Sequence, residues 1–340
     1  MPPTPQPPTL MLPRRAALQQ LAVFGAVATG ALGASSPARA QAAPKKLGAK
    51  LRFVVPALAR SSLDTAAREL GDALVIGGQC DEIEYENREA KGGTPAIAYF
   101  ADKFGRDPNA FFVADTSLAG SIAIHKPALD LSRLQPLARI TIDYLVVVVA
   151  ANGPIKTPTD LAARFKAGGK QMAVGIGQAG GADHVFAGLL AKAGGANPEE
   201  VTYTPFLRGF ELVDAVVSGK LAAGVSGYST FSADVASGKL RALGVSARKS
   251  AYGVKALREQ GVDVDLANWR AVFTGQGVPA PRQAEMVEAL KAATASDPWK
   301  KTLKQNYWES AWLAGNDLTS LMEIDSKTIQ VAVQLLKLKG

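Results

Sequence analysis

The segment Val174–Phe186, VGIGQAGGADHVF, has the pattern with the clearest chemical meaning in this 340-residue chain. It is predicted to contain the end of a strand, a glycine-rich turn and the start of a helix. Backbone N–H groups at a helix N-terminus lack intrahelical partners and lie at the positive end of the helix dipole. Such a turn is suited to hold a carboxylate or a phosphate. We therefore expect an anion site that includes Gly180, Gly181, Ala182 and Asp183.

Gly175, Gly177 and Gly180 also satisfy the spacing G-x-G-x-x-G, the fingerprint of dinucleotide-binding domains. An exported NAD-dependent oxidoreductase is therefore one hypothesis for this chain. Two features weigh against it. The strand predicted next, Val201–Thr204, ends without the acidic residue that would hold the ribose. The motif also begins more than 130 residues after the predicted export signal, whereas such domains usually open with it.

Other loops that follow predicted strands carry hydroxyl groups and two arginines. Ligands of open α/β sheets bind at the carboxyl ends of strands, so we expect these loops to line one site. An arginine offers a carboxylate a forked pair of donors, and serine and threonine hydroxyls add single donors. A capped surface turn with a solvated arginine is the alternative for the first of these loops. Besides Gly180–Asp183, the candidate ligand-binding residues are Arg60, Ser61, Ser62, Asp64, Thr116, Ser117, Phe206, Arg208, Ser226 and Tyr228.

Residues suited to catalysis are scarce. The two histidines are His125, expected in a turn, and His184, expected to pack locally or support its loop rather than act as a base. Neither belongs to a metal-ligand spacing such as H-E-x-x-H, and no G-x-S-x-G motif is present. Cys80 is the only cysteine, which excludes an intramolecular disulfide, and we expect it to be buried. The residues favour binding without a metal or cofactor, although a convergent catalytic triad stays open at this point.

Strands and helices alternate along most of the chain, which predicts an α/β fold with a largely parallel sheet. The predicted strands are Leu51–Val55, Glu82–Glu86, Phe111–Ala114, Tyr144–Ala150, Met172–Gly175, Val201–Thr204, Leu221–Ser226, Arg241–Val245 and Ala271–Thr274. A helix capped by Asp64 is predicted to run to about Ile76. Further helices are predicted over Thr94–Phe104, from Pro158, from Asp183 and over Glu211–Val217. After Pro279 we expect helices only, at Pro281–Ala295, Asp297–Tyr307 and Leu318–Leu338.

Residues 1–40 have the features of an export signal. The pair Arg14-Arg15 precedes an apolar run, Leu18–Leu32, that is too short to span a membrane. An A-x-A sequence then predicts cleavage after Ala40. General secretion and twin-arginine export both stay open, as do the first methionine and Met11 as the start of translation.

The charge of the remaining chain is modestly positive. Residues 41–340 carry 35 basic and 30 acidic side chains, a net charge of +5, which suits an anionic ligand. They contain no basic run with interleaved aromatic residues and no apolar stretch of membrane-spanning length. We therefore expect a soluble periplasmic protein that does not bind nucleic acid.

Stretches distributed over the chain after the signal form a specific combination: VVPALARSSLDTAAREL, YENREAKGGT, GGADHVFAGLLAKAGG, YTPFLRGFE, GVSGYS with GKLRALGVS, REQGVDVDLANWRAVF and WLAGNDL. In order and spacing they resemble the extracytoplasmic receptors of tripartite tricarboxylate transporters, the TctC or Bug family. The resemblance implies a two-lobed periplasmic binding protein, a Venus flytrap similar to type II, with strands that cross between the lobes. It implies lobe 1 at residues 47–148 plus 275–340 and lobe 2 at residues 149–274.

The same resemblance implies a receptor without enzymatic activity. It would capture one small organic acid between the lobes and deliver it to a membrane permease of one large and one small subunit. We expect the receptor itself to be a monomer. A periplasmic sensor whose closed form docks a receptor kinase stays open as the alternative.

Two loops depart from the pattern of this family. The first is usually P-x-x-P-G-G-x-x-D and here reads PALARSSLD at Pro56–Asp64, with Arg60–Ser62 in place of the glycines. Because a turn with positive φ is strained for these residues, we expect the loop either to run differently or to close on another ligand shape. The second departure is at Leu207-Arg208 and Phe210, where small residues are usual. We expect Arg60 and Arg208 to pair with ligand carboxylates and to shift preference away from citrate-like ligands.

Overall fold

A computed structural model describes residues 46–168 and 172–339, which belong to one compact unit of the chain. The predicted export signal, residues 1–40, lies outside the described residues. The strands are β1 (Lys50–Val55), β2 (Glu82–Asn87), β3 (Ala110–Asp115), β4 (Leu134–Ala150), β5 (Ala173–Ile176), β6 (Thr202–Pro205), β7 (Ala223–Gly227), β8 (Leu240–Val245), β9 (Ala267–Gly275) and β10 (Glu309–Ala314). The helices are α1 (Ser62–Ile76), α2 (Pro95–Phe104), α3 (Thr116–His125), α4 (Pro158–Ala167), α5 (Ala182–Ala193), α6 (Gly209–Val217), α7 (Tyr228–Ala236), α8 (Ala280–Ala295), α9 (Asp297–Asn306) and α10 (Gly315–Leu335).

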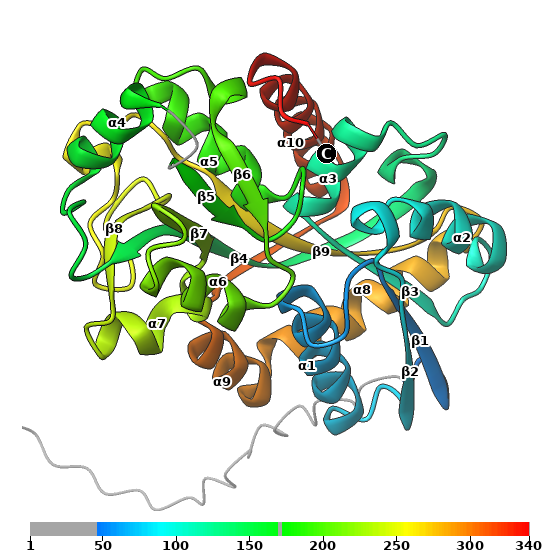
Figure 1. Cartoon of the computed structure of the whole chain (residues 1–340). Helices are drawn as coiled ribbons and strands as arrows, with labels where there is room; N and C mark the ends of the chain where they lie inside the picture. The colour runs from blue at the N-terminus through cyan, green and yellow to red at the C-terminus, as the bar shows by residue number, and fades with distance from the viewer. Residues whose placement is uncertain (1–45, 169–171, 340) are drawn as a thin grey trace, which may run out of the picture. The chain divides into compact units, whose positions relative to one another are not determined.

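The strands pair in the order β2-β1-β3-β9-β4-β7-β5-β6, and β8 and β10 also pair with β4. Strands β1, β2 and β3 are parallel to one another, as are β5, β6 and β7. The two parallel groups are joined by β4 and β9, which are antiparallel to their neighbours and cross the middle of the fold (Figure 1). The first part of the 17-residue β4 pairs with β9 and β10, and its last part pairs with β7 and β8. The α/β prediction is confirmed, but the expectation of a largely parallel sheet is wrong, because every pairing made by β4 and β9 is antiparallel.

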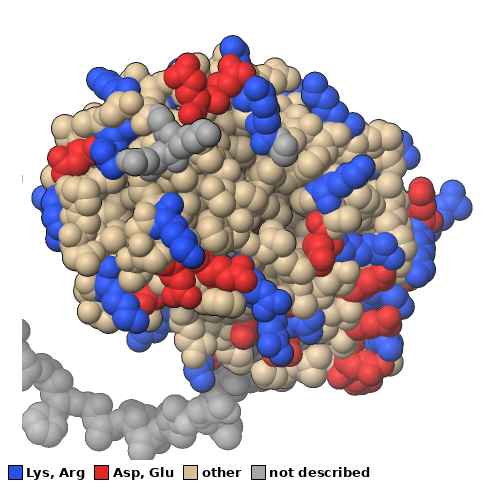
Figure 2. Space-filling model, in the orientation of Figure 1, with Lys and Arg blue, Asp and Glu red and all other residues tan. Residues whose placement is uncertain are grey.

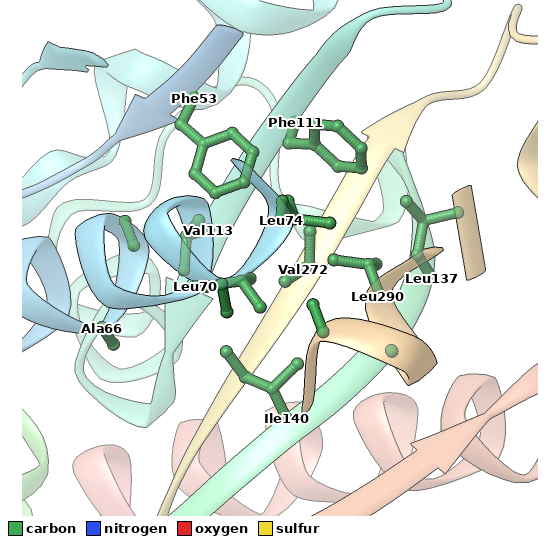
Figure 3. Packing of buried hydrophobic residues seen from close by; sticks show 14 of the residues in the cluster. Phe53, Ala66, Leu70, Leu74, Phe111, Val113, Leu137, Ile140, Val272 and Leu290 are labelled. Atoms are coloured by element: carbon green, nitrogen blue, oxygen red, sulfur yellow. The ribbon is translucent and has the colours of Figure 1, made fainter. Parts of the chain in front are cut away.

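Helices cover both faces of the sheet. On one face of the β1–β3 group, side chains from β1, β3 and β9 pack against α1 and α8; Phe53, Phe111, Leu70, Leu74 and Leu290 are fully or almost fully buried there (Figure 3). The other face is covered by α2, α3 and α10. In the other half of the sheet, formed by β5, β6, β7, β8 and the end of β4, α4 and α5 cover one face while α6 and α7 cover the other. The end of β4 is an uninterrupted apolar run because this part of the strand is buried on both faces of the sheet.

The prediction of helices only after Pro279 is wrong, because β10 (Glu309–Ala314) is a strand. Its sequence carries no clear alternation, and it is held by antiparallel pairing with β4. Strand β4 also begins at Leu134, ten residues before the predicted start at Tyr144. Polar residues interrupt that stretch, and pairing with β9 makes it a strand all the same. His125 was expected in a turn and instead ends helix α3.

The buried cysteine and the surface charges can be compared with the sequence. Cys80 is buried, with 2% of its surface exposed, as predicted. On the face shown in Figure 2, lysine and arginine are interspersed with aspartate and glutamate rather than gathered in one basic patch. Within residues 46–168 and 172–339, no helix is both long enough and apolar enough to cross a membrane.

Candidate functional site

A cavity of about 490 Å³ lies where β1, β3, β5 and β7 end and where α1, α3, α5 and α7 begin. The connections after β2 and β6 contribute further lining residues, and β4 and β9 contribute Asp143, Leu145, Asn268 and Arg270. Its volume falls in the range of roughly 300–1,000 Å³ that is typical of small-molecule sites. The carboxyl ends of the parallel strands therefore converge on one site, which is the arrangement that the loops predicted.

The structure brings part of the candidate set together around this cavity. The candidates in its lining are Ser61, Ser62, Ser117, Ala182, Asp183, Phe206 and Ser226, from five separate connections. The candidates outside its lining are Arg60, Asp64, Thr116, Gly180, Gly181, Arg208 and Tyr228. Several of this second group hold the walls in place, as their hydrogen bonds show.

Asp64 organises the loop between β1 and α1. Its buried carboxylate accepts hydrogen bonds from the Arg60 N–H at 2.7 Å, from Arg68 Nε at 2.8 Å and from Asn87 Nδ2 at 2.9 Å. The helix begins at Ser62 and is capped by Ser61, whose Oγ accepts from the Asp64 N–H at 3.2 Å. The prediction that Asp64 caps this helix is therefore wrong, because the cap is Ser61, three residues earlier. Asp64 shapes one wall of the cavity without lining it.

Arg60 shows that this loop does use a left-handed residue. Its φ is +66°, so the expectation that the loop avoids positive φ is wrong. This conformation costs a non-glycine residue about 1–2 kcal/mol, and the hydrogen bond from the Arg60 N–H to Asp64 helps to hold it. The side chains of Arg60 and Arg208 are both exposed. Their pairing with ligand carboxylates stays a prediction.

The remaining candidates outside the lining connect elements around the cavity. Thr116 Oγ1 accepts a hydrogen bond from the Trp269 N–H at 3.0 Å, which fixes the start of α3 against β9. Tyr228 stacks on Tyr252 with ring centroids 5.0 Å apart. The Gly180 N–H donates to His184 Nδ1 at 3.0 Å. These contacts give Thr116, Tyr228 and Gly180 positions in the scaffold around the site.

The start of α5 already holds an anion that belongs to the chain itself. The Asp183 carboxylate accepts hydrogen bonds from the Gly177 N–H and, at 3.0 Å, from the His184 N–H. The Ala182 N–H donates to Ser117 Oγ at 3.2 Å. A phosphate placed at this helix end would meet the Asp183 carboxylate, which weighs against the dinucleotide hypothesis. His184 is buried and supports the loop, as predicted.

The sequence interpretation missed a buried polar group in the lining. Arg270 Nη1 donates to Asp143 Oδ1 at 2.8 Å, and Arg270 Nη2 donates to Ser62 Oγ at 2.6 Å. Asn268 Nδ2 donates to the same Asp143 oxygen at 2.9 Å. The Arg270 guanidinium also lies 4.3 Å from the centre of the Trp308 ring. The available signal was a charged residue inside the otherwise mainly apolar strand ANWRAVFTG, which is Arg270.

Burial shifts the pKa values of two aspartates and one histidine near the cavity. It raises the pKa of Asp115 to about 6, against the attraction of Arg270 and a hydrogen bond from the Leu118 N–H. It raises the pKa of Asp183 to about 6 as well, against hydrogen bonds from Gly177 and His184. Burial also lowers the pKa of His184 to about 4, so its ring is neutral near pH 7. Among the described residues no group of histidine, cysteine, aspartate and glutamate is arranged to hold a metal ion.

Comparisons with solved structures support the fold at low sequence identity. A TctC solute-binding protein from Polaromonas, without ligand, is 19% identical, with a TM-score of 0.66 over 84% of this chain and 98% of that one. MatC from Rhodopseudomonas palustris with bound malate is 19% identical, with a TM-score of 0.69 over 84% and 99%. Rpa4515 from R. palustris with adipate is 17% identical, with a TM-score of 0.74 over 85% and 98%. No curated protein sequence matches the chain.

These structures have the two-lobed fold of periplasmic binding proteins, as the resemblance implied. The sequence model of a family described as "Tripartite tricarboxylate transporter family receptor" matches residues 59–337, which is most of the chain. The match begins after β1 and includes β2, β3, the β5–β7 group, most residues that line the cavity and the returning helices α8–α10. The chain therefore belongs to the tripartite tricarboxylate transporter family of receptors.

Proposed function

We propose that this chain is a periplasmic receptor that captures a small organic acid in the cavity between β1–β3 and β5–β7. Members of its family are receptors and not enzymes, and they are periplasmic. The observation that carries the proposal is the convergence of serine hydroxyls and helix starts on a cavity of about 490 Å³. Among the described lining residues, none of the hydrogen bonds of Ser61, Ser62, Ser117 and Ser226 joins the hydroxyl to a histidine or a carboxylate. Such a lining suits recognition and release of a ligand rather than its conversion.

We place the ligand carboxylate at the start of α7, where the nearby Asp143 carboxylate faces Gly227 and its charge is balanced by Arg270. No side chain caps this helix, so its first N–H groups lack side-chain acceptors. Gly227, Ser229 and Thr230 line the cavity there, beside Ser226, whose hydroxyl lies 3.1 Å from that of Thr230. A carboxylate at this end would accept from backbone N–H and hydroxyl groups and would interact with the positive end of the helix dipole.

The family also suggests lobe boundaries and a partner, which we include in the proposal. We place lobe 1 at residues 47–148 plus 275–340 and lobe 2 at residues 149–274, with β4 and β9 as the crossing strands. Closure of the lobes on the ligand would present a new surface to a membrane permease of one large and one small subunit. The receptor would act as a monomer after cleavage of its signal behind Ala40. Malate and adipate in two related structures support a carboxylate as the ligand class.

Thermal melting of the purified protein tests the proposal. The panel contains mono-, di- and tricarboxylates, amino acids and NAD. A ligand at about a thousand times its Kd stabilises the native state by roughly 4 kcal/mol, which gives a clear upward shift. A shift confined to certain carboxylates, amino acids included, is the expected result. No shift with any carboxylate would contradict the proposal, and a shift with NAD alone would support the dinucleotide hypothesis.

A pair of serine variants locates the carboxylate. Ser226→Ala removes a hydroxyl from the lining, and we expect affinity to fall about twofold to tenfold, as for the loss of one hydrogen bond of about 0.5–1.5 kcal/mol. Ser237→Ala, at the opposite end of α7, is the matched control and should leave affinity unchanged. Equal affinities of both variants would move the carboxylate away from this helix start.

A further inference from the structure

The fixed charges around the cavity are mostly negative. Asp115, Asp143 and Asp183 all line it, whereas Arg270 is the buried cation among its described lining residues. Arg270 is already paired with Asp143, so this pair adds little net charge. Near the mouth, the exposed Glu89 and Lys91 carry opposite charges. The net field inside the cavity is therefore that of Asp115 and Asp183.

Asp115 and Asp183 both keep acceptor capacity that the protein does not use fully. The Asp115 carboxylate caps α3 by accepting from the Leu118 N–H at 3.1 Å. The Asp183 carboxylate accepts only from backbone N–H groups of its own loop and helix. Each carboxylate offers about four lone-pair positions, and among the ion pairs of the described residues neither has a cationic partner at bonding distance. The Asp115 charge moreover contributes to the raised pKa of Asp183.

Asn268 adds an independent sign that the cavity lacks a donor. Its side chain is 7% exposed and lines the cavity, and its Nδ2 is used by Asp143. Its Oδ1 is buried and has no hydrogen-bond partner. A buried acceptor left unpaired costs about 1–3 kcal/mol, so a ligand that donates to it gains from satisfying it.

We propose that the ligand carries one carboxylate together with a cationic ammonium group, and that the ammonium lies among Asp115, Asp183 and Asn268. This inference rests on the proposed function, because it assigns the ligand class of the same site. The carboxylate lies at the start of α7 and the ammonium at the acidic side of the cavity. A second carboxylate in the place of the ammonium would meet two like charges and an acceptor oxygen, which disfavours di- and tricarboxylates.

The test uses probes that differ in one group. Glutarate and 4-aminobutanoate share three methylenes, and an ammonium replaces one carboxylate; adipate and 5-aminopentanoate differ in the same way. We expect calorimetry near neutral pH to give at least about tenfold tighter binding for the ammonium-bearing member of at least one pair. Dicarboxylates that bind as tightly as their partners, or more tightly, would overturn the inference and leave the proposed function standing.

Two variants make the assignment specific. Asp115→Asn keeps an oxygen that caps α3, since asparagine is as good a cap as aspartate, but it removes the charge. It should weaken binding of the ammonium-bearing probe and strengthen binding of its dicarboxylate partner. Asp130→Asn makes the same change in a residue that caps the short helix Leu131–Arg133 outside the cavity, and should alter neither affinity. An unchanged preference in Asp115→Asn and in Asp183→Asn would overturn the inference. If no carboxylate of the wider panel binds wild-type protein, the proposed function fails as well.

Discussion

Replacement of Arg270 by methionine should destabilise the protein strongly. The Arg270 and Asp143 side chains are 1% and 6% exposed, and their ion pair measures 2.8 Å. Arg270→Met leaves the Asp143 charge buried with only Asn268 as a donor, and loss of one partner of a buried pair costs about 3–5 kcal/mol. Each kcal/mol lowers Tm by roughly 2–4 °C in a large domain, so a drop on the order of 10 °C is expected.

Urea unfolding followed by tryptophan fluorescence measures this loss, and a double-mutant cycle assigns it. Asp143→Asn/Arg270→Met removes both charges and should be more stable than the sum of the single losses predicts. Arg248→Met is the control, because the Arg248 side chain is 79% exposed and its ion pair with Asp265 should contribute less than about 1 kcal/mol. A loss below about 1 kcal/mol in Arg270→Met, or additive losses in the double variant, would refute the reasoning.

Three further outcomes are expected. Because burial raises the pKa of Asp115 from 3.8 to about 6, the Asp115 carboxylate binds a proton more tightly in the folded state than in the unfolded state. Lowering the pH from 7 to 5 should therefore stabilise wild type relative to Asp115→Asn. Urea titrations at several pH values that show a constant difference in the free energy of unfolding between the two proteins would contradict this. If Arg60 pairs with a ligand carboxylate, Arg60→Ala weakens binding about tenfold in calorimetry, and unchanged affinity rules that pairing out. Cys80 is buried, and burial raises the pKa of its thiol to about 11. A thiol reagent at mildly alkaline pH should therefore label Cys80 only after urea unfolds the protein. Rapid labelling of the native protein would show that the structure around Cys80 opens locally.

The sequence predicted the strands well where a strand is a continuous apolar run in the interior of the protein. The apolar runs of β1, β3 and the end of β4 lie close to their predicted positions. Strand β10 and the start of β4 could not be read locally, because pairing with distant strands decides their conformation. Propensity is a weak guide where tertiary pairing competes with it.

The sequence likewise predicted only part of the candidate site. The rule that ligands bind at the carboxyl ends of strands located the serines and the α5 loop correctly in the cavity lining. It could not tell that Asp183 folds back to accept its own loop's N–H groups, or that Arg60 is exposed. Arg270 was missed because it lies within a strand, and only the pairing of β9 with β3 and β4 brings it beside Asp143 and Ser62.

The position of β9 between β3 and β4 has a consequence for how the chain acquires its structure. Asp115 lies opposite Arg270 in the ladder between β3 and β9, more than 150 positions later in the chain. Folding slows as contacting residues become more distant in sequence, since the entropy of a long loop must be lost first. Until residues 267–275 have been synthesised, one edge of β3 has no partner and is open to pairing with other chains. Slow refolding, and a need for protection of the nascent chain, are thus built into the order of the strands.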